Sequence, residues 1–335
     1  MTLFIQILLF LLGFVLLVKG GDWFVDGATG IAHRFHMPEI LIGATVVSIG
    51  TTIPEVMVSA AGAISGGTGG SAIAYGNAIG SIICNTALIA AITMTVRPAA
   101  VEKKSLLTPM LFFLGAAAFY VATAYITGNF SRLVGVILLA VFAAYIIVAV
   151  RQARSSMKNS QPEETRPKEE EGKKTPLWKD LLFLVLGAAV IAIGANLLVD
   201  NGTKIAEALG VPHTVIALTF VALGTSLPEL VTAITSLVKG HSDLSLGNVI
   251  GANLFNLVLV TGVATTIAPF EIPCEKTVTI GGNVLNSSLV IEIPVMLLVM
   301  MIMCLPALIK GKIYRWQGIT LLAIYAAFCV FQFVG

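Results

Sequence analysis

The chain has 335 residues, of which 57% are hydrophobic and only 11% are charged, and its formal net charge at pH 7 is +2. Soluble domains carry about a quarter charged residues, so this chain has too little polar surface for a water-soluble body of its size. The small net charge gives no argument for a nucleic-acid partner, and the composition predicts an integral membrane protein.

Apolar stretches of about 20 residues predict transmembrane helices. In chain order they span residues 2–19, 40–64, 71–95, 106–126, 131–150, 180–199, 213–237, 244–268, 288–309 and 314–334. The first is expected to be a retained helix and not a signal peptide, because its first charge, Lys19, follows the apolar core. We therefore expect an all-α integral membrane protein with ten transmembrane helices.

A polar segment at residues 151–179 interrupts the series and divides the chain into two five-helix halves, 1–150 and 180–335. Its mixed charge and lack of periodic apolar residues predict a flexible linker. The glutamates of this segment do not have the spacing of an EF-hand loop, so we interpret them as a solvated charge run and not as a calcium sensor.

The basic residues determine the expected orientation, because cytoplasmic loops are enriched in Lys and Arg. With the linker placed in the cytoplasm, seventeen Lys and Arg residues fall on the inner side and three on the outer side. This predicts a multi-pass protein of the cell (inner or plasma) membrane with a cytoplasmic linker and both termini outside.

The two halves repeat one another at an offset of 174 residues. IGATVVSIGTTIPEV at 42–56 matches IALTFVALGTSLPEL at 216–230, and after a three-residue deletion GNAIGSIICN at 76–85 matches GNVIGANLFN at 247–256. An odd number of spans in each half makes the copies enter the membrane from opposite sides. Such inverted repeats are typical of transporters, whose binding sites lie near the midplane where helices of both halves are broken.

Each half carries one glutamate deep in an apolar span, Glu55 or Glu229, directly after a proline. A carboxylate at this depth is costly unless it is paired or coordinates an ion. Hydrogen bonding between helices is the alternative role for a single buried glutamate. Two glutamates at equivalent repeat positions favour a shared function in ion binding.

The residues around the glutamates explain how a cation is bound. Pro54 and Pro228 have no N–H group, so the carbonyl groups about four residues earlier lose their helical partners and become available as ligands. Hydroxyl groups are added by Thr51, Thr52, Thr225 and Ser226. Carboxylates, carbonyls and hydroxyls are hard oxygen donors, which suit Ca²⁺ and Na⁺ better than softer metals.

A second polar stripe follows in each half. Asn77, Ser81 and Asn85 recur every four residues and share one helix face, and Asn248 and Asn256 recur in the same way around Ala252. These side chains either bind the ion or join neighbouring helices by hydrogen bonds.

The paired motifs GTTIPE…GNAIGSIICN and GTSLPEL…GNVIGANLFN resemble those of the sodium/calcium exchanger family, prokaryotic type, of the calcium/cation antiporter superfamily. The resemblance covers nearly the whole chain. It implies a secondary active antiporter that exchanges Na⁺ for Ca²⁺ by alternating access. We expect no cofactor beyond the transported Ca²⁺ and Na⁺, no enzymatic activity and no obligatory protein partner. The expected partners are these ions and the lipid bilayer.

The resemblance also implies the ion ligands. Glu55 and Glu229 would be the central Ca²⁺ and Na⁺ ligands, and the carbonyl groups of Ser48 and Ala222 would serve flanking Na⁺ sites. The remaining implied ligands are Thr51, Thr52, Ser81, Asn85, Thr225, Ser226 and Asn256.

Three positions depart from the family pattern. Ala252 replaces a common Ser and Ile82 a common Asn, while Asn256 stands where many members have Asp. Glu55 and Glu229 are then the only carboxylates expected at the site, and they balance one Ca²⁺ or two Na⁺. An additional Na⁺ would make the exchange electrogenic.

The residues alone leave several alternative functions open. Proton/calcium antiport is one, although Gly80-Ser81 and Gly251-Ala252 occupy the places where proton-coupled relatives carry Glu-His. Potassium-dependent sodium/calcium antiport is another. An intramembrane hydrolase is disfavoured, because the Gly-x-Gly-Asp and HExxH signatures do not occur, and inverted repeats favour a carrier over a channel.

Overall fold

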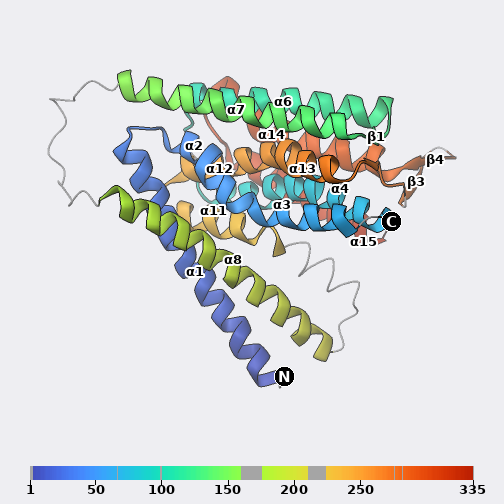
Figure 1. Ribbon diagram of the computed structural model, residues 1–335, viewed down its shortest axis with the longest axis horizontal. Coiled ribbons are helices and arrows are strands. Elements are labelled where there is room, and N and C mark those ends of the chain that lie inside the picture. Colours follow the sequence, from blue (N-terminus) through green and yellow to red (C-terminus); the bar gives the residue numbers. More distant parts are fainter. Residues whose placement is uncertain are drawn as a thin grey trace. The chain divides into compact units, whose positions relative to one another are not determined.

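The computed structural model describes residues 3–65, 67–98, 100–159, 176–209, 224–274, 276–280 and 282–334. The chain divides into two compact units. The first unit comprises Met1–Gly50 and Ile146–Asn248, and the second comprises Thr51–Tyr145 and Val249–Gly335. Almost all of the regular structure is helical, as the composition predicts (Figure 1).

Eight helices within the described residues are long and apolar enough to cross a membrane. They span Leu3–Arg34, Glu39–Ile64, Ala74–Val96, Lys103–Ile126, Arg132–Ser155, Leu177–Ala208, Ser242–Ile267 and Ser288–Lys310. These agree with eight of the predicted spans. The span predicted at 213–237 lies partly outside the described residues, and the one predicted at 314–334 corresponds to helix α15 (Arg315–Val334).

The first unit is built around two 32-residue helices, α1 (Leu3–Arg34) and α8 (Leu177–Ala208). Its shorter elements are α2 (Glu39–Ile42), the π-helix η1 (Gly43–Val47), α11 (Leu227–Lys239), the first residues of α3 (Ser48–Ser65), the end of α7 (Arg132–Asn159) and the start of α12 (Ser242–Phe255). The 151–159 part of the predicted linker is therefore helical.

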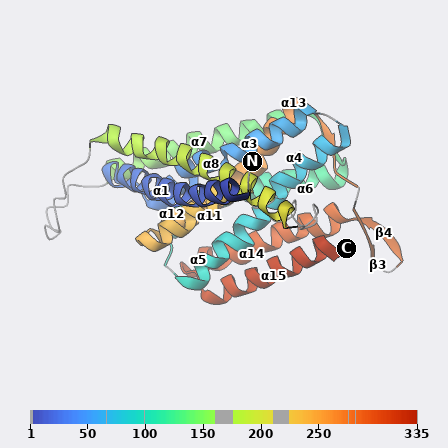
Figure 2. The same cartoon turned by 90° about the horizontal axis from the view of Figure 1, so that it is seen from below.

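The second unit holds the rest of α3, α7 and α12 together with the remaining helices. These are α4 (Gly67–Cys84), the π-helix η2 (Asn85–Ala90), α5 (Ala91–Val96), α6 (Lys103–Ile126), the π-helix η4 (Asn256–Val260), α13 (Thr261–Ile267), the π-helix η5 (Ser288–Glu292), α14 (Ile293–Lys310) and α15. In Figure 2, α5 and α14 run beside α15.

Glycines bring α1 and α8 into close antiparallel contact. A Cβ atom on Gly20 would lie 3.0 Å from the Gly187 carbonyl oxygen, and one on Gly13 would lie 2.8 Å from that of Gly194. Lipid tails give little hydrophobic drive for helix association, so close backbone approach through small residues is what holds membrane helices together. Leu17 lies between these two contacts in the buried core of the unit.

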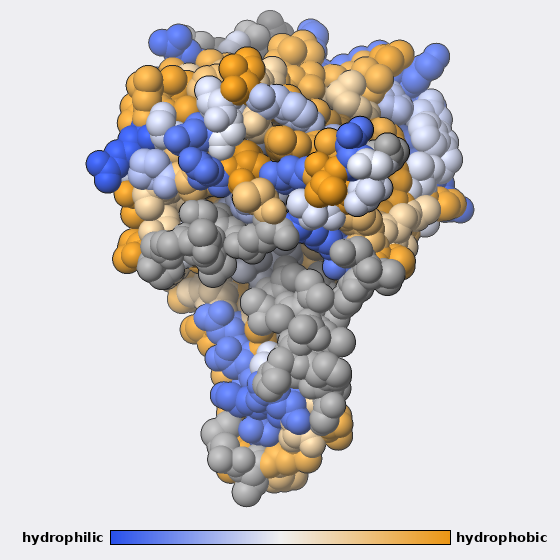
Figure 3. Space-filling model, turned by 90° about the vertical axis from the view of Figure 1, so that its right-hand side faces the viewer, coloured by the Kyte–Doolittle hydropathy of each residue, from blue (hydrophilic) through white to orange (hydrophobic). Residues whose placement is uncertain are grey.

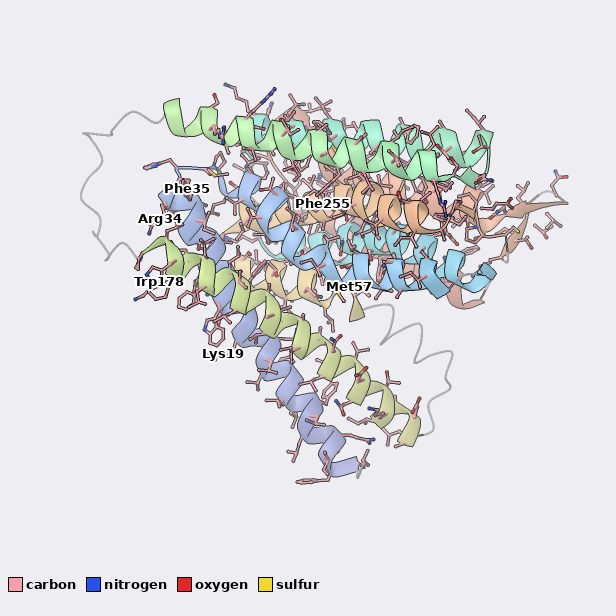
Figure 4. All side chains as sticks on the ribbon, in the orientation of Figure 1. Lys19, Arg34, Phe35, Met57, Trp178 and Phe255 are labelled. Atoms are coloured by element: carbon pink, nitrogen blue, oxygen red, sulfur yellow. The ribbon has the colours of Figure 1, made fainter. Side chains whose placement is uncertain are left out.

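An ion pair joins the adjoining ends of these helices. Arg34, in the last turn of α1, lies 3.4 Å from the Asp180 carboxylate in the first turn of α8. Figure 4 labels Arg34 together with the neighbouring Trp178. Both charges also suit the helix dipoles, since an acid is favoured at a helix N-terminus and a base at a C-terminus.

The first helix is longer than the predicted span of 2–19, because α1 continues without a break to Arg34. Asp26 lies inside this extension of α1 and accepts a 2.8 Å hydrogen bond from Lys239 of α11. The helix continues because its inward face remains apolar through Phe24, Val25 and Ala28, which all belong to the core of the unit.

The second unit has an aromatic core and two small antiparallel ladders. Phe255 meets Phe142 and Tyr145 edge-on, with ring centroids 5.1 and 5.9 Å apart. Strand β1 (Asn129–Phe130) pairs with β2 (Phe270–Glu271), and β3 (Thr277–Ile280) pairs with β4 (Asn283–Asn286). The sequence did not predict these strands, whose pairing depends on the tertiary fold and on the turn at Gly282, where φ is +85°.

Large apolar side chains are exposed along several helices, including Leu11, Leu133 and Val185. Apolar residues cover much of the face shown in Figure 3. Such a surface is stable in the hydrocarbon layer and would aggregate in water. The outward-facing residues therefore agree with a multi-pass membrane protein.

The glycine contact between α1 and α8 can be tested by adding one methyl group. Gly187→Ala would place Cβ 2.5 Å from the Phe24 backbone nitrogen, so we expect a loss of about 1–3 kcal/mol in stability. Gly115→Ala in α6 is the matched control, because nothing lies within 4 Å of its Cβ position. Melting of the purified protein in detergent measures both, and an equal melting temperature for the two variants would contradict the close contact.

Candidate functional site

In the second unit, Glu55 lies inside α3 and is fully buried. Thr51 and Thr52, which precede it by about one turn, are also buried. The sequence predicted a broken helix at Pro54, but α3 runs through this residue, and the irregular turn lies upstream at η1. Proline removes one N–H donor from the helix and the chain accommodates this without a break.

Asn77 of α4 holds the backbone of α3 at this point. Its Nδ2 atom donates to the carbonyl oxygen of Glu55 at 3.0 Å and to the Ser59 hydroxyl at 2.8 Å. The contact accounts for Asn77 as a link between helices, one of the two roles left open by the sequence. It also fixes the main-chain position from which the Glu55 side chain extends.

Asn85 and Asn256 occupy corresponding structural positions in the two repeats, because each is the first residue of a π-helix, η2 or η4. Both side chains are fully buried, and neither amide has a hydrogen-bond partner among the described residues. Single π-helical turns within α-helices are frequent at functional sites. Ser81, one turn before Asn85, is also buried.

In the first unit, Glu229 lies in the first turn of α11 and is fully buried. Here the predicted break is present, because Thr225 and Ser226 form a turn and the helix begins at Leu227, just before Pro228. Ser226 is buried, and its hydroxyl has no hydrogen-bond partner within the described ranges. A glutamate in the first turn lies at the positive end of the helix dipole.

Ser48 belongs to the same unit and is fully buried. Its hydroxyl oxygen lies 2.7 Å from the Gly43 carbonyl oxygen and 2.9 Å from that of Asn248. The hydroxyl therefore links η1 to α12, whereas the sequence assigned a role only to the Ser48 carbonyl group. Ala222, its predicted counterpart, lies outside the described residues.

The predicted ligands are thus distributed over both units. Ser48, Thr225, Ser226 and Glu229 belong to the first, and Thr51, Thr52, Glu55, Ser81, Asn85 and Asn256 belong to the second. Each set combines one carboxylate with neutral oxygen donors, a composition that suits Na⁺ and Ca²⁺. Within the part of the chain that the structure describes, no three His, Cys, Asp or Glu side chains gather as a metal-binding group.

The repeat comparison did not identify Asn253, which is fully buried in α12 and hydrogen bonded to Thr86 of η2 at 2.7 Å. The reason is that its repeat counterpart is Ile82, so no matching polar residue marked the position. The one signal in the sequence was that Ile82, at the equivalent position, replaces an Asn that is common in the resembling family.

The family described as sodium/calcium exchanger protein matches residues 5–151 and 179–334. An uncharacterized membrane protein of Methanocaldococcus jannaschii is 35% identical over 94% of both chains. The sodium/calcium exchanger MaX1 of Methanosarcina acetivorans is 31% identical over 98% of this chain and 99% of its own.

The fold is also similar to that of a solved protein. A structure of the sodium-calcium exchanger NCX_Mj, soaked with Na⁺ and Sr²⁺, superposes with a TM-score of 0.76. The two chains are 32% identical, and the match covers 97% of this chain and 98% of the other.

Two asparagines allow a test of which buried amides contribute to folding. Asn77→Leu removes two hydrogen bonds and should cost about 1–3 kcal/mol of stability. Asn256→Leu removes an amide without a partner among the described residues, so it should leave stability unchanged or raise it. Melting in a buffer with chelator and without sodium distinguishes them, and a larger loss for Asn256→Leu would refute the comparison.

Proposed function

The chain belongs to the sodium/calcium exchanger protein family, and we propose that it exchanges Na⁺ for Ca²⁺ across the cell membrane by alternating access. The observation that carries this proposal is the pair of fully buried glutamates, Glu55 and Glu229, each of which ends a Gly-Thr-x-x-Pro-Glu segment. A buried carboxylate at membrane depth is stable only when a positive charge compensates it.

The transported ions are proposed to bind through oxygen donors on both repeats. Glu55 and Glu229 supply two negative charges, which neutralise one Ca²⁺ or two Na⁺. Thr51, Thr52, Ser81, Asn85, Thr225, Ser226 and Asn256 supply neutral oxygens, with the carbonyl groups of Ser48 and Ala222. The amides of Asn85 and Asn256, which have no partner among the described residues, support this assignment.

The proposed architecture is ten transmembrane helices arranged as two inverted five-helix repeats, 1–150 and 180–335, joined by a linker at 151–179. The contacts of α1 and α8 support it, because the offset of 174 relates Gly13 to Gly187 and Gly20 to Gly194. Exchanging the repeats converts the Gly13–Gly194 contact into the Gly20–Gly187 contact. This is the relation expected of a two-fold axis between antiparallel helices.

The proposed orientation places the linker in the cytoplasm and both termini outside, since most basic residues then lie on the inner side. Sodium is favoured over protons as the driving ion because Ser81 and Ala252 provide no titratable group. A Na⁺ beyond the two that the carboxylates balance would carry one net charge in each cycle, so the exchange is electrogenic.

Removing either carboxylate charge should abolish Ca²⁺ transport. Glu55→Gln and Glu229→Gln keep the side-chain shape but leave one charge of the bound Ca²⁺ without compensation, at a cost of about 3–5 kcal/mol. We therefore expect at least about a hundredfold slower Na⁺-driven Ca²⁺ uptake in proteoliposomes for each variant.

Glu271→Gln serves as the control, because Glu271 is exposed in β2 and is not a proposed ligand. It should transport at the rate of the parent protein. Transport within twofold of the parent rate by either Glu55→Gln or Glu229→Gln would refute the assignment of that residue.

The driving ion and the charge balance can be tested in the same vesicles. An outward Na⁺ gradient should drive Ca²⁺ into the vesicles, and an inside-positive potential should accelerate this uptake because each cycle moves one net positive charge outward. The potential contributes about 2.3 kcal/mol per elementary charge per 100 mV. Uptake driven by a proton gradient without Na⁺, or uptake indifferent to voltage, would overturn the mechanism.

A further inference from the structure

Three fully buried side chains of the second unit form a hydrogen-bonded cluster. Asn253 of α12 donates through Nδ2 to the Thr86 hydroxyl at 2.7 Å and to the Met300 sulfur of α14 at 3.1 Å. The Thr86 hydroxyl lies 3.3 Å from the same sulfur. All three residues have no exposed surface, so the contacts are formed away from water.

The chemistry of Met300 determines the orientation of the amide. A thioether sulfur only accepts hydrogen bonds, so the Asn253 atom beside it must be the amide nitrogen. The Thr86 hydroxyl then accepts from Asn253 and uses its single proton to donate to Met300. The Oδ1 atom of Asn253 therefore has one fixed direction, and it has no hydrogen-bond partner among the described residues.

The cluster lies next to both asparagines that we propose as ion ligands. Thr86 directly follows Asn85 in η2, and Asn253 precedes Asn256 of η4 by three residues. Phe255, which is labelled in Figure 4, marks the end of α12 just before η4 begins. The hydrogen bond between Thr86 and Asn253 therefore fixes the two π-helical starts relative to one another. Met300 connects both to α14.

This cluster has no counterpart when the repeats are exchanged. The positions equivalent to Asn253 and Thr86 are Ile82 and Leu257, which are apolar and fully buried. A buried polar pair is costly unless fully bonded, and an apolar pair at the equivalent positions shows that packing alone does not require it. The polar pair Thr86 and Asn253 therefore occurs once, and the pair at the equivalent repeat positions is apolar.

We propose that Asn253, held by Thr86 and Met300, is a positioning residue that sets the spacing of the Asn85 and Asn256 side chains for the bound cation. The inference rests on the proposed exchange function and adds to it a residue that need not contact the ion. A cation site tolerates little displacement of its ligands, so a loose support weakens ion binding even where every ligand remains.

Thr86→Val tests the proposal with almost no change in side-chain shape, since it replaces the hydroxyl by a methyl group. A buried neutral hydrogen bond is worth a factor of about five to ten, so the Ca²⁺ concentration that gives half of the Ca²⁺-dependent rise in melting temperature should increase by about that factor. The KM for Ca²⁺ in Na⁺-driven uptake should rise in parallel. Thr86→Ser, which keeps the hydroxyl, should bind Ca²⁺ as the parent does.

Thr265→Val is the matched control. Thr265 of α13 is fully buried in the same unit, and its hydroxyl has no hydrogen-bond partner in the described part of the chain. The same substitution there should leave the Ca²⁺ titration unchanged. Asn253→Leu should reproduce the Thr86→Val effect, and the double variant should be no worse than the weaker-binding single variant, because both remove one shared interaction.

The outcomes separate this proposal from the proposed function. A parent protein that shows neither Ca²⁺-dependent stabilisation nor Na⁺-driven uptake would refute both. A parent that binds and transports Ca²⁺, with a Thr86→Val half-point within twofold of the parent, would refute the positioning role alone. A Thr86→Val variant with a lower melting temperature but an unchanged Ca²⁺ half-point would equally overturn it, because the hydrogen bond would then serve only stability.

Discussion

A bilayer provides no water to solvate a charge or to complete a hydrogen bond, and this constraint governs the arrangement of the polar groups in this protein. Glu55 and Glu229 are fully buried in a chain with only 11% charged residues, so their positions need a physical explanation. Under the proposed function a transported cation provides this explanation, because its positive charge would compensate the two carboxylates. The neutral oxygen donors proposed on the same segments would add ligands to the cation without adding further charge.

The two repeats are alike in sequence but differ in the local structure around each glutamate. Pro54 lies within a continuous helix, whereas Pro228 lies at a helix start that places Glu229 in the first turn. Glu229 therefore experiences the positive end of a helix dipole, and Glu55, in mid-helix, does not. Two carboxylates of equal charge thus have different local backbone surroundings.

Folding and function place opposite demands on the buried amides. Asn77 and Asn253 donate to protein acceptors and join helices, so they contribute to stability in the ion-free protein. The amides of Asn85 and Asn256 have no such partners among the described residues, and their burial costs stability until a ligand binds. The glycine contacts of α1 and α8 and the aromatic core around Phe255 supply stabilising contacts that need no ligand.

The sequence by itself determined the membrane environment, most of the helices, the repeat and the two carboxylates. Apolar length, charge distribution and repeated motifs are local properties that do not depend on how the helices pack. It also indicated the break before Pro228, because proline disfavours a helical interior. It could not show that α3 runs through Pro54, that α1 continues to Arg34, or that Asn85 and Asn256 begin π-helices. Those features depend on contacts between residues far apart in the chain, such as Asn77 with the Glu55 carbonyl group and Asn253 with Thr86, and only the tertiary structure brings these atoms within hydrogen-bonding distance.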